Sequence, residues 1–175
     1  MSFAVSHTEI NSRISAPAAE SSENGSHIHA HPILLESRRA AAAANTPYAG
    51  GISPLDAHAL FAEGIVVLVD VRTVEERKFV GHVPGSVHVA WQIGAALTRN
   101  PRFIRELEGK VAKDAVLLFL CRSGKRSAAA AEAATKAGFT NAYNVLEGFE
   151  GDLDNAQQRG SNGGWRLHGL PWVQD

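Results

Sequence analysis

One short segment carries the residue types needed for nucleophilic chemistry on an anion. Cys121 is the only cysteine in the 175 residues, and it comes directly after the apolar run AVLLFL. Three basic residues, Arg122, Lys125 and Arg126, follow within five positions. Because the thiolate form of cysteine is the nucleophile, and nearby cations favour that form, the segment predicts that Cys121 acts as a nucleophile.

The residues after Cys121 predict a loop that ends at the start of a helix. A glycine in this loop is free to adopt a positive φ, and the following SAAAAEAATKAG is a strong helix former that Gly138 closes. Unpaired backbone N–H groups and the positive end of the helix dipole stabilise a negative charge at such a position. We therefore expect a ring around the sulfur made by Arg122, Ser123, Gly124, Lys125, Arg126 and Ser127.

Alternating strands and helices are predicted to position this loop. The run IVVLVDVR, from Ile65, is typical of a strand covered on both faces, and AVLLFL is a second such strand. Ser53-Pro54 begins a predicted helix that Gly64 ends, and Thr73 can cap another. This alternation predicts an α/β fold, an open parallel sheet of about five strands with helices on both faces.

Two charged residues are expected to share the sheet edge with the cysteine. Ligands of open parallel sheets bind outside the carboxyl ends of the strands, where Cys121 is predicted to lie. Asp70 and Arg72 end the neighbouring predicted strand. They either help to organise the site or form a purely structural ion pair. His82 is assigned to a turn with Pro84 and Gly85, as a packing residue.

The loop differs from other loops that handle anions. A nucleotide-binding P-loop has Ser or Thr after Gly-Lys, whereas here Arg126 follows. A serine-hydrolase elbow needs glycines on both sides of its serine, and neither Ser123 nor Ser127 has them in that pattern. Cysteine phosphatases resemble this arrangement, but their loop is one residue longer than the four residues between Cys121 and Arg126.

Several blocks of the chain resemble the single-domain rhodaneses, a family of sulfurtransferases. The resemblance covers residues 51–172, and the blocks occur in the order of the family: LVDVR, GHVPGSVHVAW, CRSGKRSA, NVLEGFEGD and GLPW. It implies transfer of a sulfane sulfur from a donor such as thiosulfate to a thiol or cyanide acceptor, through a persulfide on Cys121. It also implies no metal and no organic cofactor. In this family, residues equivalent to Asp70 and Arg72 help to organise the site.

Two other functions remain open at the level of sequence. The first is a sulfur carrier or binding module, in which the loop delivers sulfur to one acceptor protein without turning over free donor. The second is a phosphatase or arsenate reductase of the cysteine-loop type, which the short loop disfavours. The donor, the acceptor and the role of each loop cation are not specified by the sequence.

The first part of the chain is predicted to be a flexible extension. Residues 1–47 are rich in Ser, Ala, Asn and His and show no sustained periodicity, so we expect the domain to span residues 48–175. Within the extension, ILLESRRAAAAAN could form a short helix. His27, His29 and His31 alternate, but no cysteine or carboxylate lies at ligand spacing, so we predict a solvated tail and no metal site.

The composition narrows the classes of partner. A formal net charge of −1 provides no overall field for nucleic acid, so binding of a charged substrate must depend on the local cations. A lone cysteine is compatible with a reducing compartment. The sequence contains no apolar run of membrane-spanning length and no secretory signal pattern, so we expect a cytoplasmic protein that binds neither membrane nor nucleic acid.

Overall fold

The computed structural model describes residues 31–174, and they contain a five-stranded parallel sheet in the order β1-β7-β6-β2-β3. The strands of this sheet are β1 (Gly50–Ile52), β2 (Val67–Asp70), β3 (Val87–His88), β6 (Leu117–Leu120) and β7 (Ala142–Val145). A separate antiparallel hairpin is formed by β4 (Gln92–Ile93) and β5 (Thr98–Arg99). The helices are α2 (Pro32–Ala43), α3 (Pro54–Ala62), α4 (Val74–Val80), α5 (Phe103–Glu108) and α6 (Lys125–Lys136).

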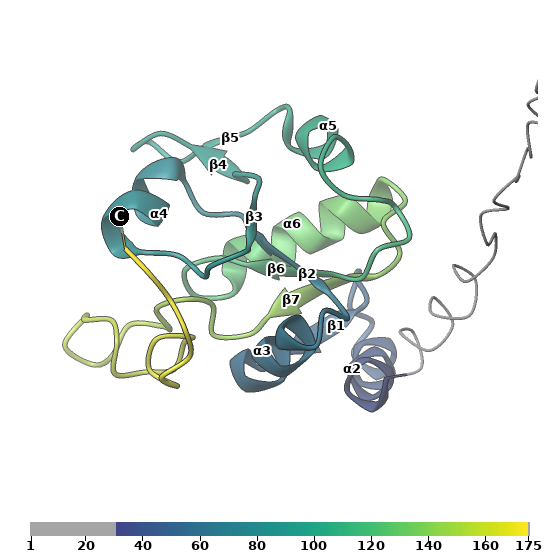
Figure 1. Ribbon diagram of the computed structural model, residues 1–175, viewed down its shortest axis with the longest axis horizontal. Helices are drawn as coiled ribbons and strands as arrows, with labels where there is room; N and C mark the ends of the chain where they lie inside the picture. The colour runs from purple at the N-terminus through teal and green to yellow at the C-terminus, as the bar shows by residue number, and fades with distance from the viewer. Residues whose placement is uncertain (1–30, 175) are drawn as a thin grey trace, which may run out of the picture.

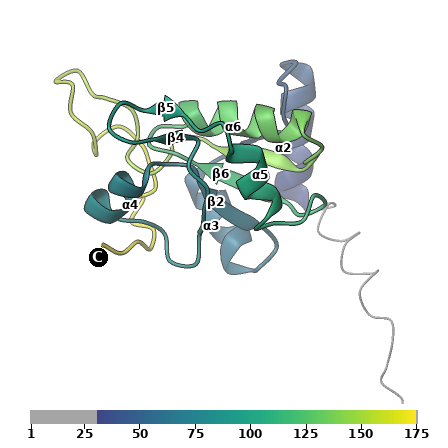
Figure 2. The ribbon, with the colours of Figure 1, turned by 90° about the horizontal axis from the view of Figure 1, so that it is seen from above.

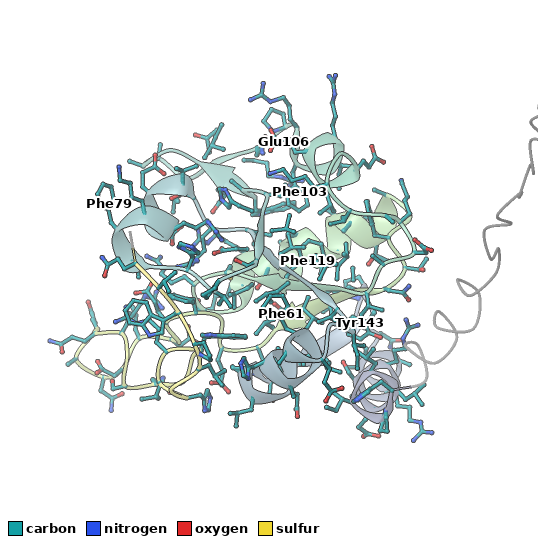
Figure 3. The ribbon with its side chains drawn as sticks, in the orientation of Figure 1. Phe61, Phe79, Phe103, Glu106, Phe119 and Tyr143 are labelled. Atoms are coloured by element: carbon teal, nitrogen blue, oxygen red, sulfur yellow. The ribbon has the colours of Figure 1, made fainter. Side chains whose placement is uncertain are left out.

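Helices cover both faces of the sheet, which confirms the predicted architecture (Figure 1). Side chains of β6 alternate between two buried clusters, as the pleat of a strand requires. Leu118 and Leu120 pack with residues of α2 and α3, whereas Leu117 and Phe119 pack with residues of α5 and α6. Figure 3 shows Phe103 on the side of α5 and Tyr143 on the side of α3.

The domain begins earlier than predicted, because α2 packs on the sheet. Leu34 is fully buried in the cluster on that face, and Arg38 donates to the Tyr143 hydroxyl at 2.6 Å and to Asn141. Ser37 donates to the carbonyl of Gly51 at 2.9 Å. Residues 32–47 are therefore not a flexible extension. The short helix has a weak sequence signal because its stability comes from tertiary contacts.

Leu34→Ala is expected to lower the free energy of unfolding by about 3 kcal/mol, because it empties a fully buried site. Leu35→Ala is the matched control, since the neighbouring side chain on the same helix is 39% exposed. We expect the control to change stability by less than about 1 kcal/mol. Chemical denaturation of both variants measures the difference, and equal effects would show that α2 does not contribute to the folded core.

Local sequence signals predicted the starts of α3 and α4. The Ser53 side chain accepts from the backbone N–H of Asp56 at 3.1 Å, as predicted for the start of α3. At α4, Thr73 and Glu76 form a reciprocal capping box. The sequence analysis did not identify β1, β7 or the hairpin, because these strands are short and two of them contain glycine or asparagine where an apolar run is expected.

The last described residues lie beside α4, as the two ribbon views show (Figures 1 and 2). His82 exchanges backbone hydrogen bonds with Val173 at 2.8 and 2.9 Å, and Gln174 donates to the carbonyl of Phe79 at 2.7 Å. His82 thus lies in an anchored segment next to the predicted turn. Within residues 31–174 we find no helix whose length and apolar content would let it cross a membrane.

Candidate active site

Cys121 lies where the sequence predicted, immediately after β6 at the carboxyl edge of the sheet. The neighbouring strand β2 ends at Asp70, whose register partner is Leu120, so both strands bring their last residues to the same edge. The backbone N–H of Val71 donates to the carbonyl of Leu120 at 2.8 Å and extends this pairing. The Cys121 side chain is buried, with 1% of its surface exposed.

Two donors from the loop and helix α6 hold the cysteine sulfur. The backbone N–H of Gly124 lies 3.2 Å from Cys121 Sγ, and the Ser127 hydroxyl lies 3.1 Å from it. Gly124 is the N-cap residue of α6 and has a φ of 90°, a left-handed conformation that glycine adopts without strain. No side chain caps this helix, so its first backbone N–H groups add a positive partial charge beside the sulfur. The sulfur therefore lies next to two hydrogen-bond donors and the start of a helix.

Arg126 is held by a carboxylate from a distant part of the chain. Its guanidinium makes two parallel contacts with Glu76, at 2.6 and 2.8 Å, and both side chains are largely buried. Burial disfavours both charges, but this pairing outweighs burial, so the pKa of Arg126 lies above its ordinary value and that of Glu76 below. Glu76 also accepts from the backbone N–H of Thr73 at 3.0 Å, so one carboxylate connects α4 to the start of α6.

Asp70 and Arg72 form a buried ion pair beneath the site. Arg72 donates to Asp70 from its side chain at 2.7 and 3.0 Å, and neither side chain is exposed. Arg77 adds a third contact to the same carboxylate at 2.9 Å. Burial raises the pKa of Asp70, but the two arginines outweigh this effect and hold the pKa below its ordinary value. The Arg72 guanidinium also stacks on the ring of Phe149, 4.0 Å from its centroid.

A turn after β7 closes over the backbone of the cysteine loop. The backbone N–H of Phe149 donates to the carbonyl of Cys121 at 2.7 Å, and that of Glu150 donates to Arg122 at 2.9 Å. Gly148, with a φ of 66°, approaches the loop so closely that a Cβ would lie 2.6 Å from three of its backbone atoms. The conformation of the cysteine loop therefore depends on a glycine that the sequence analysis did not assign to the site.

Gly148→Ala is expected to destabilise the protein through a clash with backbone that cannot move away easily. Gly94→Ala is a matched control, because Gly94 has the same φ of 66° but no atom within 4 Å of the added Cβ. The control isolates the backbone strain, about 1–2 kcal/mol. Gly148→Ala should cost at least about 2 kcal/mol more by chemical denaturation. Equal losses would mean that the turn and the loop are not in tight contact.

The remaining loop residues differ in what surrounds them. Lys125 is exposed and lies 3.4 Å from Asp152, and Ser123 lines a cavity of about 460 Å³ with residues of the C-terminal segment. Of the three loop cations, Arg122 alone has no ion-pair partner among residues 31–174. The three loop cations, which the sequence analysis treated as one group, therefore have different surroundings in the structure.

No cluster of three potential metal ligands occurs in the described part of the chain. His27 and His29 lie outside the described residues. His31 caps α2, where its Nδ1 accepts from the backbone N–H of Ile33 at 3.3 Å.

Cys121 is thus buried at the end of a strand, beside the N-terminus of α6, and a second turn closes over its loop. The family model described as Rhodanese-like domain matches residues 53–154. The chain therefore belongs to the rhodanese-like domain family.

The chain is also similar to several known proteins, one of them with a solved structure. The chain is 47% identical to the protein in the crystal structure of Rv0390 from M. tuberculosis, with a TM-score of 0.66 over 73% of this chain and 99% of that one. It is 39% identical to the uncharacterized protein RC0915 of Rickettsia conorii, over 60% of this chain and 80% of the relative. It is 29% identical to thiosulfate sulfurtransferase 16, chloroplastic, of Arabidopsis thaliana, over 69% of this chain and 89% of the relative.

Sequence reasoning missed Glu76 and Gly148 as residues that shape the site. The Thr73-x-x-Glu76 spacing was a visible signal for a capping box, but a local motif does not reveal a partner fifty positions away. For Gly148 the only signal was a glycine within a block that resembles the family.

Proposed function

We propose that this protein is a sulfurtransferase that carries sulfur as a persulfide on Cys121. The Cys121 thiolate attacks the outer sulfur of thiosulfate, a new S–S bond forms, and sulfite leaves with the electron pair of the broken bond. Cyanide or a thiolate then attacks the terminal sulfur of the persulfide. The Cys121 thiolate is released, and the product is thiocyanate or a persulfide of the acceptor.

The observation that carries this proposal is the environment of the cysteine sulfur. Gly124 and Ser127 both direct donors at Cys121 Sγ, and the start of α6 adds the positive end of its dipole. A persulfide anion extends this negative charge by one atom, so the same fixed donors stabilise the thiolate and the intermediate. The Arabidopsis relative, which carries the name of a thiosulfate sulfurtransferase, supports thiosulfate as the donor.

Loop length supports sulfur over phosphate as the transferred group. The four residues between Cys121 and Arg126 close a tight ring, and Arg126 is already occupied by Glu76. A tetrahedral phosphate needs a wider ring and an arginine free to bind its oxygens. Here the arginine positions the start of α6 instead.

Intact-mass measurement after incubation with thiosulfate tests the proposal. The chain should gain the mass of one sulfur atom, lose it when cyanide is added, and release thiocyanate with repeated turnover. Hydrolysis of an aryl phosphate at the same protein concentration should be negligible. If Cys121 is loaded with sulfur but the protein does not turn over free thiosulfate, the protein is a sulfur carrier that serves a partner protein and not an enzyme. If the protein cleaves the aryl phosphate efficiently and gains no sulfur, it is a phosphatase.

We assign recruitment of the anionic donor to Arg122, the loop cation without an ion-pair partner in the described chain. Arg122→Gln is expected to raise KM for thiosulfate by roughly threefold to tenfold at low salt, and added salt should reduce the difference. Lys125→Gln is the matched control, because Lys125 is exposed and lies near Asp152, and its effect should be smaller. A larger effect for Lys125 would reverse the assignment.

A further inference from the structure

A second cavity at the same end of the molecule is lined almost entirely by nitrogen-bearing side chains. It has a volume of about 540 Å³, and its lining residues are Val74, Arg77, Lys78, His82 and His88. These residues come from α4 and from the segment between α4 and the end of β3. None of the five is acidic, so the cavity gathers cationic and imidazole groups without a carboxylate in its wall.

The wall of this cavity carries more positive than negative charge, and the acids on α4, Glu75 and Glu76, are not part of the wall. Arg77 contacts Asp70 at 2.9 Å, but that carboxylate is also paired with Arg72, so two arginines share one negative charge. The described chain provides no salt bridge for Lys78, which is exposed and lies near the ring of Phe79, at the outer side of α4 in Figure 3. The local excess of positive charge favours an anion.

Arg77 and the backbone of His82 are held in place before any ligand binds. Arg77 donates to Asp70 and to the Ser86 hydroxyl at 3.0 Å, which fixes its guanidinium. His82 is anchored by its backbone pairing with Val173. The Nδ1 atom of His82 is buried and has no hydrogen-bond partner within residues 31–174. The backbone of His82 is fixed at the wall of the cavity by the C-terminal segment.

His88 is suited to respond to a negative charge. Its Nε2 lies 2.8 Å from the carbonyl of Arg72, which can only accept, so Nε2 carries a hydrogen and donates it. Burial lowers the pKa of His88 and outweighs the hydrogen bond to Arg72 and the negative charge of Asp70, which raise it. The positive charges of Arg77 and Lys110 lower this pKa further. The ring is therefore neutral near neutral pH when the cavity holds no anion, and a bound anion would favour its protonated form.

We propose that this cavity binds a doubly charged oxyanion of the phosphate type, held by Arg77, Lys78, His82 and His88. The ligand is either free phosphate or the phosphate group of a larger molecule, since both present the same oxygens. The cavity is distinct from the cysteine loop, and none of its lining residues contacts Cys121 in a hydrogen bond or ion pair.

Calorimetric titration of inorganic phosphate into the full chain, at fixed ionic strength set with chloride, tests this site. Lys78→Gln should weaken binding by roughly tenfold, because it removes a charge-assisted contact. Lys136→Gln is the matched control, since Lys136 is an exposed lysine paired with Glu132 on α6. A second titration with glycerol 2-phosphate distinguishes the two sources, because tighter binding of the ester indicates a phosphate-bearing molecule.

Arg122→Gln separates this cavity from the cysteine loop. We expect the phosphate affinity of this variant to equal that of the wild type. In the wild-type chain, NMR should show that phosphate raises the pKa of His88. Loss of binding in Arg122→Gln with no loss in Lys78→Gln would place the anion in the cysteine loop and overturn the proposal. Absence of binding to the wild-type chain would overturn it as well. Neither readout depends on sulfur transfer.

Discussion

Cys121→Ser is expected to lower sulfur transfer by at least about 10³-fold and to abolish the mass gain after thiosulfate treatment. The chain contains no other cysteine that could carry the sulfur. Serine is nearly isosteric, and its hydroxyl can still accept from Gly124, so the fold should be retained. Steady-state transfer to cyanide, intact mass and thermal melting together measure the effect.

Ser127→Ala is the informative comparison for this variant. It keeps the nucleophile but removes the hydroxyl that lies 3.1 Å from Cys121 Sγ. Loss of one hydrogen bond to a charged group should lower transfer by roughly tenfold, much less than loss of the sulfur itself. If Cys121→Ser retained activity near that of the wild type, the covalent mechanism would be wrong.

Asp70→Asn is expected to have the largest effect on stability, a loss of about 3–5 kcal/mol in the free energy of unfolding. The substitution preserves shape, but it leaves the fully buried guanidinium of Arg72 without its counter-charge. Arg77, which contacts the same carboxylate, loses a partner at the same time. Chemical denaturation at neutral pH, where the wild-type carboxylate is ionised, measures the change.

Asp152→Asn is the matched control, because it makes the same Asp-to-Asn change at an exposed ion pair. Asp152 also pairs with a cation, Lys125 at 3.4 Å, but its side chain is 53% exposed. Exposed pairs contribute about 0–1 kcal/mol, so this variant should remain near the wild type. Similar losses in both variants would show that the buried pair contributes no more to stability than an exposed one.

The stability that Asp70 provides should also depend on pH. Its folded-state pKa lies below the ordinary value, so its contribution is complete above the pKa of the unfolded chain. The contribution is lost as pH falls from that value through the lower folded-state pKa. Asp70→Asn should therefore lose less relative to the wild type in acid than at neutral pH.

The sequence by itself determined the parts of the molecule that depend on local pattern. The continuous apolar runs of β2 and β6 predicted buried parallel strands, and the residues after Cys121 predicted a helix start beside a nucleophile. Ser53 and Thr73 predicted helix caps, because a cap depends on residues within one turn. The resemblance to the rhodaneses rested on such blocks and is confirmed by the family match.

Only the tertiary structure decided which distant groups meet. Whether Arg126 faces a substrate or a carboxylate depends on where α4 lies relative to α6, and the structure pairs it with Glu76. Likewise, α2 is ordered because Leu34 fills a space between elements that are far apart in the chain. The cavity beside α4 exists because residues 74–88 fold back and the C-terminal segment anchors His82. Sequence periodicity reports which side chains share a face of one element, but packing free energy between elements decides what that face contacts.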